Sequence, residues 1–424
     1  MGATIMKPRN LARALLLGAL AAAPAACAHG ASAPAFVPSD SRVANAHARS
    51  NRARPFPDTT SNVHLEMVFN YLQKNLNAES GVVDMVWGSS YAAKPAAMYN
   101  TAYIPYSVDN YGHPVSWYKK NHPDWLEYKC DRTSLAFQFG ATNLAPFDFT
   151  NPAVQAFQWA NWVDPQLAEG YRGIAVDTMS LTNDWKQCGH FTTGGTWVPQ
   201  FSGRENDATF RSAMLSWEAN TYAHVHAQSP AATMQVNYSY EFGVSRADNL
   251  QLMTTTDLLF DERGFTNWGS RQNVASPSEW RTIAGAIAYV ESKGGCYTTN
   301  AEEPGPTSGI TPQERQWVIA NYLLVKNDCT YMYMTGYNGK AQGYGVLVTF
   351  PEYAIAIGSA TGPMKAAQGA YARAFTNGLA IVNPSRASVR YTLPSGTYKT
   401  VGGQVEGPAV TLGPSTGLIL LKGR

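Results

Sequence analysis

The chain has 424 residues and a formal net charge of +2, and charged residues make up only 15% of it. Such a weak charge offers no basic field for nucleic acid and no acidic, solvating tail. The length is enough for one large domain with a smaller appendage. Aromatic residues reach 12%, which is common in proteins that stack rings on sugars and also in large hydrophobic cores.

The N-terminal region predicts export. Basic residues precede the apolar stretch ALLLGALAAA, and small residues follow it in PAACAHGASA. This is the order of a secretory signal peptide, whose apolar part is too short to span a bilayer. We expect residues 1–28 to be removed, residues 29–58 to form a disordered linker, and the protein to be secreted or periplasmic. The alternative is a lipid anchor at Cys27, although Pro24 stands where a lipobox has leucine. No later segment of the sequence is long and apolar enough to predict a transmembrane helix.

Export would place the four remaining cysteines in an oxidising compartment. Four cysteines allow three pairings, and we expect Cys130–Cys188 and Cys296–Cys329 because each pair would tie neighbouring segments. The sequence has no C-x-x-C or H-E-x-x-H spacing, and its eight histidines are scattered. We therefore expect neither a metal site nor a cofactor.

From about residue 60, a helix-like segment (VHLEMVFNYLQKNL) is followed by short apolar runs that alternate with helical patterns. The apolar runs cover residues 81–89, 102–110, 144–150, 173–180, 233–240, 257–265, 294–300 and 329–336. Amphipathic patterns predict helices over residues 152–170, 207–228, 277–294 and 311–328. Eight strands with intervening helices predict an α/β fold, a (β/α)8 TIM barrel, over residues 59–365.

Beyond residue 365 the pattern changes to β-like runs separated by proline, glycine and serine turns. We expect a small antiparallel, sandwich-like β domain over residues 366–424. The segment from Gly413 to Gly417 fits G-x-S-x-G, but a nucleophile elbow needs a helix after the serine, and here a strand follows. Ser415 is therefore expected to lie in a β-turn.

Polar residues stand where several predicted strands end, and in a TIM barrel these positions face the active site. The second to sixth runs end on Asp109, Asp148, Asp177, Asn237 with Tyr238, and Asp261 with Glu262. Converging acids repel one another and raise one another's pKa, which is unfavourable in a purely structural protein. A reaction that needs both an acid and a carboxylate has a use for them.

Two carboxylates and abundant aromatic residues indicate glycoside hydrolysis. The fourth and sixth strand ends lie across a barrel mouth, so we expect Asp177 to act as nucleophile or base and Glu262 as general acid. Asp261 would point away from this pair, toward a helix. Asp109 and Asp148 are candidate substrate contacts, with helix capping as the other interpretation. Further candidate substrate contacts, for which core packing is the alternative role of the rings, are Asn237, Trp87, Tyr106, Tyr238, Trp268 and Tyr333.

The segments NHPDWLEYKCD, APFDFTNPAVQAFQWANWV, GYRGIAVDTMS, VNYSY and LLFDERGF, in this order, resemble a group of bacterial TIM-barrel proteins, the hypothetical glycosyl hydrolase family 15. The resemblance runs from about residue 80 to the segment ARAFTNGLAIVNPS. The family pattern at the fourth strand is Gly-aromatic-Asp-Gly, apolar residues, then Asp-Asn. In this chain Arg172 replaces the first Asp of the pattern, and Thr178 replaces the final Asn. The resemblance implies Asp177 and Glu262 as the catalytic pair and Asp148 as a substrate contact.

The leading hypothesis is a secreted glycoside hydrolase that acts on a polysaccharide or oligosaccharide. The alternatives are a non-catalytic carbohydrate-binding barrel, lipid-anchored or free, and a transglycosylase. The separation of the Asp177 and Glu262 carboxyl groups discriminates between catalysis with retention, catalysis with inversion and binding alone.

Overall fold

The computed structural model describes residues 56–70, 81–90, 98–106, 113–268, 276–337, 343–345 and 347–423, together with the backbone of 108–109. The predicted signal peptide, most of the predicted linker and Cys27 lie outside these residues. Within them, no helix is long and apolar enough to cross a membrane.

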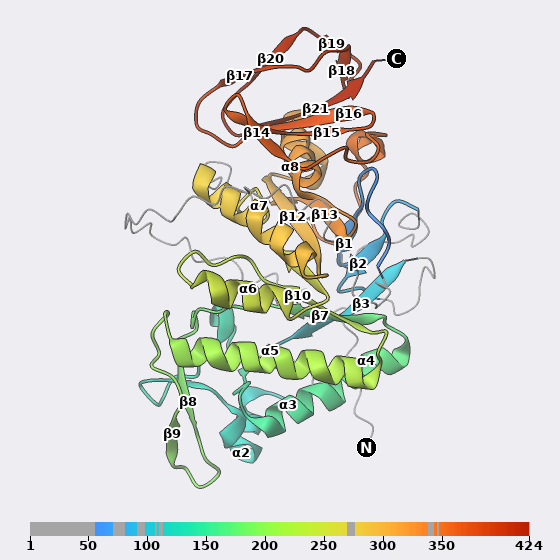
Figure 1. Cartoon of the computed structure of the whole chain (residues 1–424). Coiled ribbons are helices and arrows are strands. Elements are labelled where there is room, and N and C mark those ends of the chain that lie inside the picture. Colours follow the sequence, from blue (N-terminus) through green and yellow to red (C-terminus); the bar gives the residue numbers. More distant parts are fainter. Residues whose placement is uncertain are drawn as a thin grey trace.

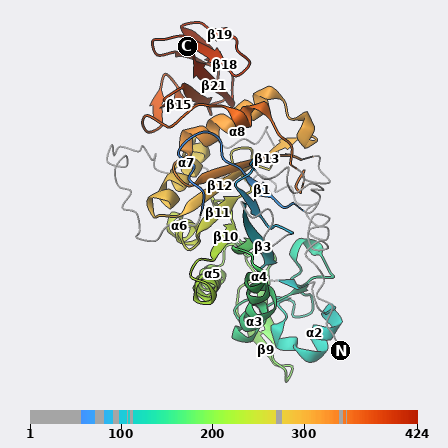
Figure 2. The same cartoon turned by 90° about the vertical axis from the view of Figure 1, so that its right-hand side faces the viewer.

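Eight parallel strands form the central sheet, in the order β1-β2-β3-β7-β10-β11-β12-β13 (Figures 1 and 2). A parallel bridge between Leu65 and Met332 joins the first strand to the last. The (β/α)8 barrel predicted from the sequence is confirmed. The strands are β1 Glu66–Val68, β2 Met85–Trp87, β3 Tyr99–Pro105, β7 Gly173–Asp177, β10 Thr233–Asn237, β11 Leu258–Asp261, β12 Cys296–Pro304 and β13 Thr330–Tyr337.

From β3 to β13, helices connect successive barrel strands and lie against the outside of the barrel (Figure 1). They occupy the four predicted segments. The first contains α3 Pro152–Gln158, which continues through a π-helical turn (Trp159–Val163) into α4 Asp164–Glu169. The other three are α5 Ala208–Gln228, α7 Pro277–Ser292 and α8 Pro312–Val325. A further helix, α6 Arg246–Thr254, precedes β11. Both α7 and α8 begin with a capping box and a proline in the first turn, local signals that fix where each helix starts.

Two of the predicted elements near the start of the barrel are wrong. The described part of the helix-like segment after residue 60 contains β1, the first barrel strand, whose three residues are all buried. The run at 144–150 is not a barrel strand, because β6 (Ala145–Pro146) pairs with β4 (Val108–Asp109) in a separate two-stranded sheet. A strand buried on both faces shows no alternation, so a short apolar run does not reveal which sheet it joins. The two errors offset each other, and the strand count stays at eight.

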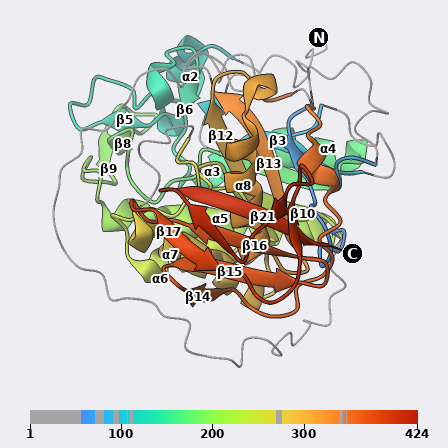
Figure 3. The ribbon, with the colours of Figure 1, turned by 90° about the horizontal axis from the view of Figure 1, so that it is seen from above.

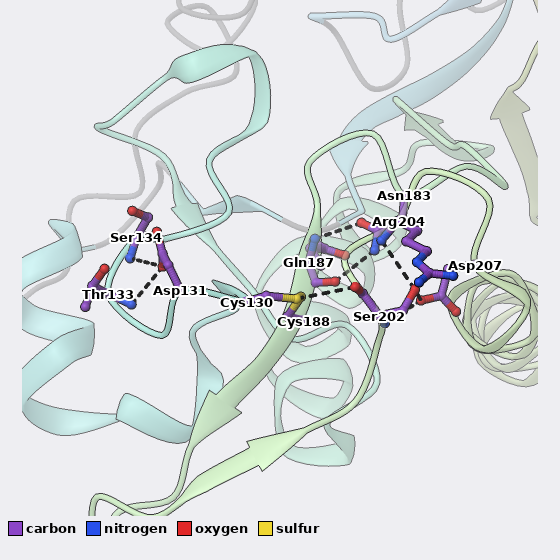
Figure 4. The surroundings of a disulfide bond; sticks show 10 residues. All are labelled: Cys130, Asp131, Thr133, Ser134, Asn183, Gln187, Cys188, Ser202, Arg204 and Asp207. Carbon is purple, nitrogen blue, oxygen red and sulfur yellow. Dashed lines mark hydrogen bonds between the residues drawn. A yellow bond between two sulfur atoms is a disulfide. The ribbon is translucent and has the colours of Figure 1, made fainter.

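The segments that follow β3 and β7 together form a lateral unit with its own small sheet, which consists of β5 Tyr128–Lys129 from the first segment and of β8 Gln187–Phe191 and β9 Trp197–Pro199 from the second. The predicted disulfide Cys130–Cys188 ties its two halves together (Figure 4). A side chain at Gly203 would collide with both sulfur atoms, 2.5 and 2.6 Å from an added Cβ. The unit also contains α2 (Val115–Asn121) and connects to α5 through Asp207, the helix N-cap, which accepts hydrogen bonds from Ser202.

The second predicted disulfide, Cys296–Cys329, is also confirmed. It joins the start of β12 to the residue before β13, at the amino-terminal end of the barrel. Both cysteines are buried.

The C-terminal region is an antiparallel β domain, as the sequence predicts. Its main sheet has the order β14-β15-β16-β21-β18-β19, and β17 pairs with β20. The strands are β14 Lys365–Ala367, β15 Ala370–Phe375, β16 Gly378–Asn383, β17 Val389–Thr392, β18 Tyr398–Thr400, β19 Val405–Glu406, β20 Ala409–Leu412 and β21 Thr416–Lys422. The sheet packs on α8 (Figures 1 and 3). Ser415 lies in the turn before β21, so the G-x-S-x-G match is structural.

Candidate active site

Three neighbouring strands place Asp177, Asn237 and Glu262 together at the carboxyl end of the barrel. Asp177 is the last residue of β7, Asn237 the last of β10, and Glu262 directly follows β11. The Asn237 side-chain nitrogen Nδ2 donates to Asp177 Oδ1 at 2.8 Å and to Glu262 Oε2 at 3.1 Å. Because both bonds go to one nitrogen, these two oxygens are at most about 6 Å apart, a limit below the separation found in inverting glycosidases.

Asp177 accepts hydrogen bonds on both of its oxygens. Tyr103 Oη donates to Oδ2 at 2.9 Å, while Asn237 and the backbone N–H of Thr178 donate to Oδ1. Thr178 reaches this position with a φ of 60°, a left-handed conformation that costs a β-branched residue free energy. Burial raises the pKa of Asp177 above its usual value, and the three donors, which favour the ionised form, offset only part of this rise.

Glu262 shares the Asn237 donor and accepts a second hydrogen bond, from Tyr344 Oη to Oε1 at 2.9 Å. Burial and, to a smaller extent, the neighbouring charge of Asp177 raise the pKa of Glu262 to about 7. Of the two acids, Asp177 has more donors and Glu262 keeps its proton to near neutral pH, which is the division of roles that acid and carboxylate catalysis requires.

Aromatic rings pack against one another and against Tyr103 and Tyr344, the two phenols that donate to the carboxyl groups. Trp87 stacks on Phe260 at 5.0 Å, and Phe69 contacts the rings of Tyr103 and Tyr344 at 5.6 and 6.0 Å. Trp87 was predicted to stack on a sugar, but it is 1% exposed inside the barrel. Its ring therefore packs in the core below the site.

Three other predicted stacking residues, Tyr106, Tyr238 and Tyr333, are also buried, with at most 1% of their surface exposed. Tyr238 follows the inward-facing Asn237, so it points out of the barrel, and its hydroxyl donates to Asn249 on α6 at 2.6 Å. Strand alternation explains this correction, because neighbouring residues face opposite sides of the sheet. None of the three rings has a face free for a sugar.

Asp148 is displaced from the site because its segment is not a barrel strand. It is 1% exposed and accepts hydrogen bonds from Gln200 at 2.8 Å and from Thr150, with His190 Nδ1 at 3.0 Å. These partners belong to the lateral unit, so Asp148 is a structural residue there. The predicted cap is also wrong, since Asn151 caps α3. Asp109 ends β4, outside the barrel sheet, and its side chain lies outside the described residues.

Asp261, next to Glu262, faces away from Asp177, as alternation predicts. It accepts from Ser239 at 2.6 Å and from Tyr297 at 2.5 Å. These partners come from the loop after β10 and from β12, rather than from a helix. Asp261 therefore fixes the strand end that carries Glu262. The turn that follows needs Gly264, because an added Cβ would lie 1.8 Å from the backbone oxygen of Asn300.

Trp268 is the one predicted stacking residue with a large exposed ring, at 46%. Its ring and that of Phe242, which is 40% exposed, lie 5.8 and 4.7 Å from the guanidinium of Arg263. Arg263 follows Glu262 directly, and Phe242 lies in the loop after β10. Two exposed aromatic rings therefore make cation–π contacts with the same arginine, which is the residue next to Glu262 in the chain.

The sequence reading missed Tyr103, Tyr344 and Glu302. Glu302 lies near the end of β12, in the seventh barrel position, and its Oε1 lies 2.7 Å from Tyr344 Oη. The pair of acids in NAEEPG was a usable signal, but the predicted strand stopped at residue 300. Tyr344 lies in a loop, where no periodic pattern marks it. Among the described residues, no group of three or more histidine, cysteine or acidic side chains could hold a metal ion.

Residues 91–379, more than half of the chain, match the family model described as hypothetical glycosyl hydrolase family 15. No curated protein matches the chain. Among solved structures, an α-amylase from Anoxybacillus has 11% identity and a TM-score of 0.50, over 88% of this chain and 99% of that one. The glycoside hydrolase domain of PelA from Pseudomonas aeruginosa has 14% identity and a TM-score of 0.39, over 64% and 94%. At such identities the likeness concerns the fold alone.

Proposed function

The chain belongs to the hypothetical glycosyl hydrolase family 15, and from this premise we propose that it is an exported glycoside hydrolase that cleaves a polysaccharide or oligosaccharide with retention of configuration. The two carboxyl groups bridged by the amide of Asn237 carry the proposal. The shared donor supports a separation shorter than the roughly 6.5–9.5 Å at which an inverting enzyme places a water between substrate and base. Both residues keep part of their surface exposed, so a substrate can reach them.

In the proposed first step, the Asp177 carboxylate attacks the anomeric carbon while Glu262 gives its proton to the glycosidic oxygen. The carbon–oxygen bond breaks, its electron pair stays on the leaving sugar, and a glycosyl ester forms on Asp177. In the second step, Glu262 takes a proton from water, and the resulting hydroxide displaces Asp177. The hydrogen bonds to Asp177 from Tyr103, Asn237 and Thr178 support this assignment, because they favour the ionised nucleophile.

Trp268 and Phe242 are the proposed sugar-binding rings beside Glu262. Their exposed faces suit stacking on the apolar faces of pyranoses, and the Arg263 guanidinium holds both. Export is proposed from the N-terminal charged and apolar segments. The two disulfides agree with an oxidising compartment.

The first test is reducing-end release from a panel of bacterial and plant polysaccharides. We expect activity in the unchanged protein, with losses of about 10²–10⁴-fold in Glu262→Gln and at least as large in Asp177→Asn. Glu169→Gln, at an exposed position on α4, is the control and should retain full activity. Binding without turnover, unaffected by either active-site change, would instead support a carbohydrate-binding barrel.

The stereochemical test is proton NMR of the first product formed from an active substrate. Retention requires that the new anomer match the substrate linkage before mutarotation. An inverted first product would contradict the double displacement and the role of Asp177 as nucleophile. Products longer than the substrate would point to transglycosylation.

A further inference from the structure

A third carboxyl group, that of Glu302, lies behind the proposed catalytic pair. Tyr344 Oη lies 2.7 Å from Glu302 Oε1 and 2.9 Å from Glu262 Oε1. Glu302 is only 1% exposed, whereas Glu262 is partly exposed. A substrate that reaches Glu262 therefore has no access to Glu302, and any effect of Glu302 on the reaction passes through Tyr344.

The hydrogen bonds around the phenol restrict how many protons the two glutamates hold. Asn300 Nδ2 can only donate, and it does so to Tyr344 Oη at 2.8 Å. The phenol has one proton, so it can donate to only one of the two carboxyl oxygens beside it. The other oxygen must bring its own proton, since two unprotonated oxygens would otherwise face each other at hydrogen-bond distance. At least one of the two glutamates is therefore protonated in this arrangement.

We infer that Glu302 is a positioning residue that keeps its proton and, through the phenol of Tyr344, prepares Glu262 to donate to the leaving group. The inference rests on the proposed function of Glu262. The Glu302 O–H donates to Tyr344 Oη, which leaves the phenol proton for Glu262 Oε1. When Glu262 releases its proton to the glycosidic oxygen, the new carboxylate already faces a donor. No net proton leaves Glu302 in this step.

The charges around the pair support protonated Glu302. Burial and, to a smaller extent, the charge of Glu262 raise the pKa of Glu302 to about 8. The other acidic groups that act on Glu262 are Asp177 and Asp261, which also oppose ionisation. Glu302 is buried whereas Glu262 is partly exposed, so ionisation costs more at Glu302, which remains protonated after Glu262 has ionised.

The test compares the pH dependence of kcat/KM for the full chain and for Glu302→Gln. If Glu262 and Glu302 must both be protonated, log kcat/KM of the unchanged protein falls with a slope that approaches −2 above about pH 8. Glutamine is neutral and can still donate to Tyr344, so Glu302→Gln should fall with a slope of −1 and keep its activity at pH 6 within about threefold. Glu303→Gln, at the buried neighbouring position on β12 whose side chain lies on the opposite face of the strand, is the matched control and should keep the wild-type slope.

A slope that is the same in Glu302→Gln as in the unchanged protein would overturn the inference. So would a loss of more than about 100-fold at pH 6 in a variant with an unchanged circular dichroism spectrum, because Glu302 would then act as a charged group. Carbon-13 NMR of glutamate-labelled protein provides a test without substrate. A carboxyl signal that titrates near pH 8 and disappears in Glu302→Gln is expected even if the chain hydrolyses no glycan in the panel. The absence of such a signal would contradict the inference independently of the proposed function.

Discussion

The barrel mouth and the junction between barrel and β domain both bury charged groups, but they hold them differently. At the junction, Arg373 on β15 donates to the backbone oxygens of Leu323, Leu324 and Lys326 at the end of α8 and to Gly362. These carbonyls are the acceptors that a helix leaves unpaired at its C-terminus. Arg373 therefore keeps a fixed charge with its own acceptors.

At the mouth, Asn237 and Tyr344 are each shared between two carboxyl groups. Two carboxyl groups that share one donor are incompletely stabilised in their ionised forms. The pKa values of Glu262 and Glu302 are accordingly raised toward neutral pH. A buried charge with its own partners stabilises the contact between two domains, whereas buried acids that share partners can transfer protons. We therefore expect substitutions at the junction to change mainly the stability, and substitutions at the mouth to change mainly the pH dependence of kcat/KM.

Arg373→Met should produce the largest change in stability. Removing the guanidinium leaves several buried carbonyls without a donor, and the free energy of unfolding should fall by about 3 kcal/mol. Chemical denaturation measures this loss, and Arg373→Lys, which keeps the charge with fewer donors, should lose less. The pH profile of kcat/KM should stay unchanged. A shifted profile would mean that the junction and the mouth are coupled.

Glu66→Gln tests a buried acid with a partner of its own. Glu66 lies in β1, accepts from Thr298 at 2.5 Å, and has its pKa raised by burial from 4.5 to about 8. The folded protein holds this proton when the unfolded chain has lost it, so stability is lost as the pH rises from about 5 to 8, by up to about 5 kcal/mol. The variant should show a flatter dependence of stability on pH. The fall of kcat/KM at high pH should be the same in Glu66→Gln as in the unchanged protein, whereas in Glu302→Gln it should be less steep.

Tyr344→Phe should change catalysis more than stability. The phenol bond favours ionised Glu262, so its loss raises the pKa of Glu262 and moves the basic limb of kcat/KM to higher pH. The weaker acid should also lower kcat, by about tenfold. Tyr353→Phe, which removes a buried phenol near the β domain, is the control. An unmoved basic limb would show that Tyr344 does not act on Glu262.

Thr178→Asn should give the smallest effect. Asparagine tolerates the left-handed conformation better than threonine, so the free energy of unfolding should rise by up to about 1 kcal/mol. The backbone N–H of residue 178 would still donate to Asp177, and kcat should stay within about twofold. A large loss of activity would instead assign the threonine side chain itself a role in the site.

The sequence by itself determined the barrel, the four predicted helices and the rim position of Asp177, Asn237 and Glu262. Capping signals and apolar periodicity are local, and parallel strands bring their carboxyl ends to one rim whatever fills the loops. The two cysteine pairs also followed from the sequence, because neighbouring segments were the natural partners.

Only the tertiary structure decided which polar residues meet at that rim. Asp148 lies in the lateral unit rather than at the rim, because its short apolar run pairs in another sheet. Tyr238 faces out of the barrel because its neighbour Asn237 faces inward. Tyr103 and Tyr344 reach the acids from positions 74 and 82 residues away in the chain. Periodicity reports the face on which a residue lies, whereas the sharing of one donor between two acids depends on how distant segments pack.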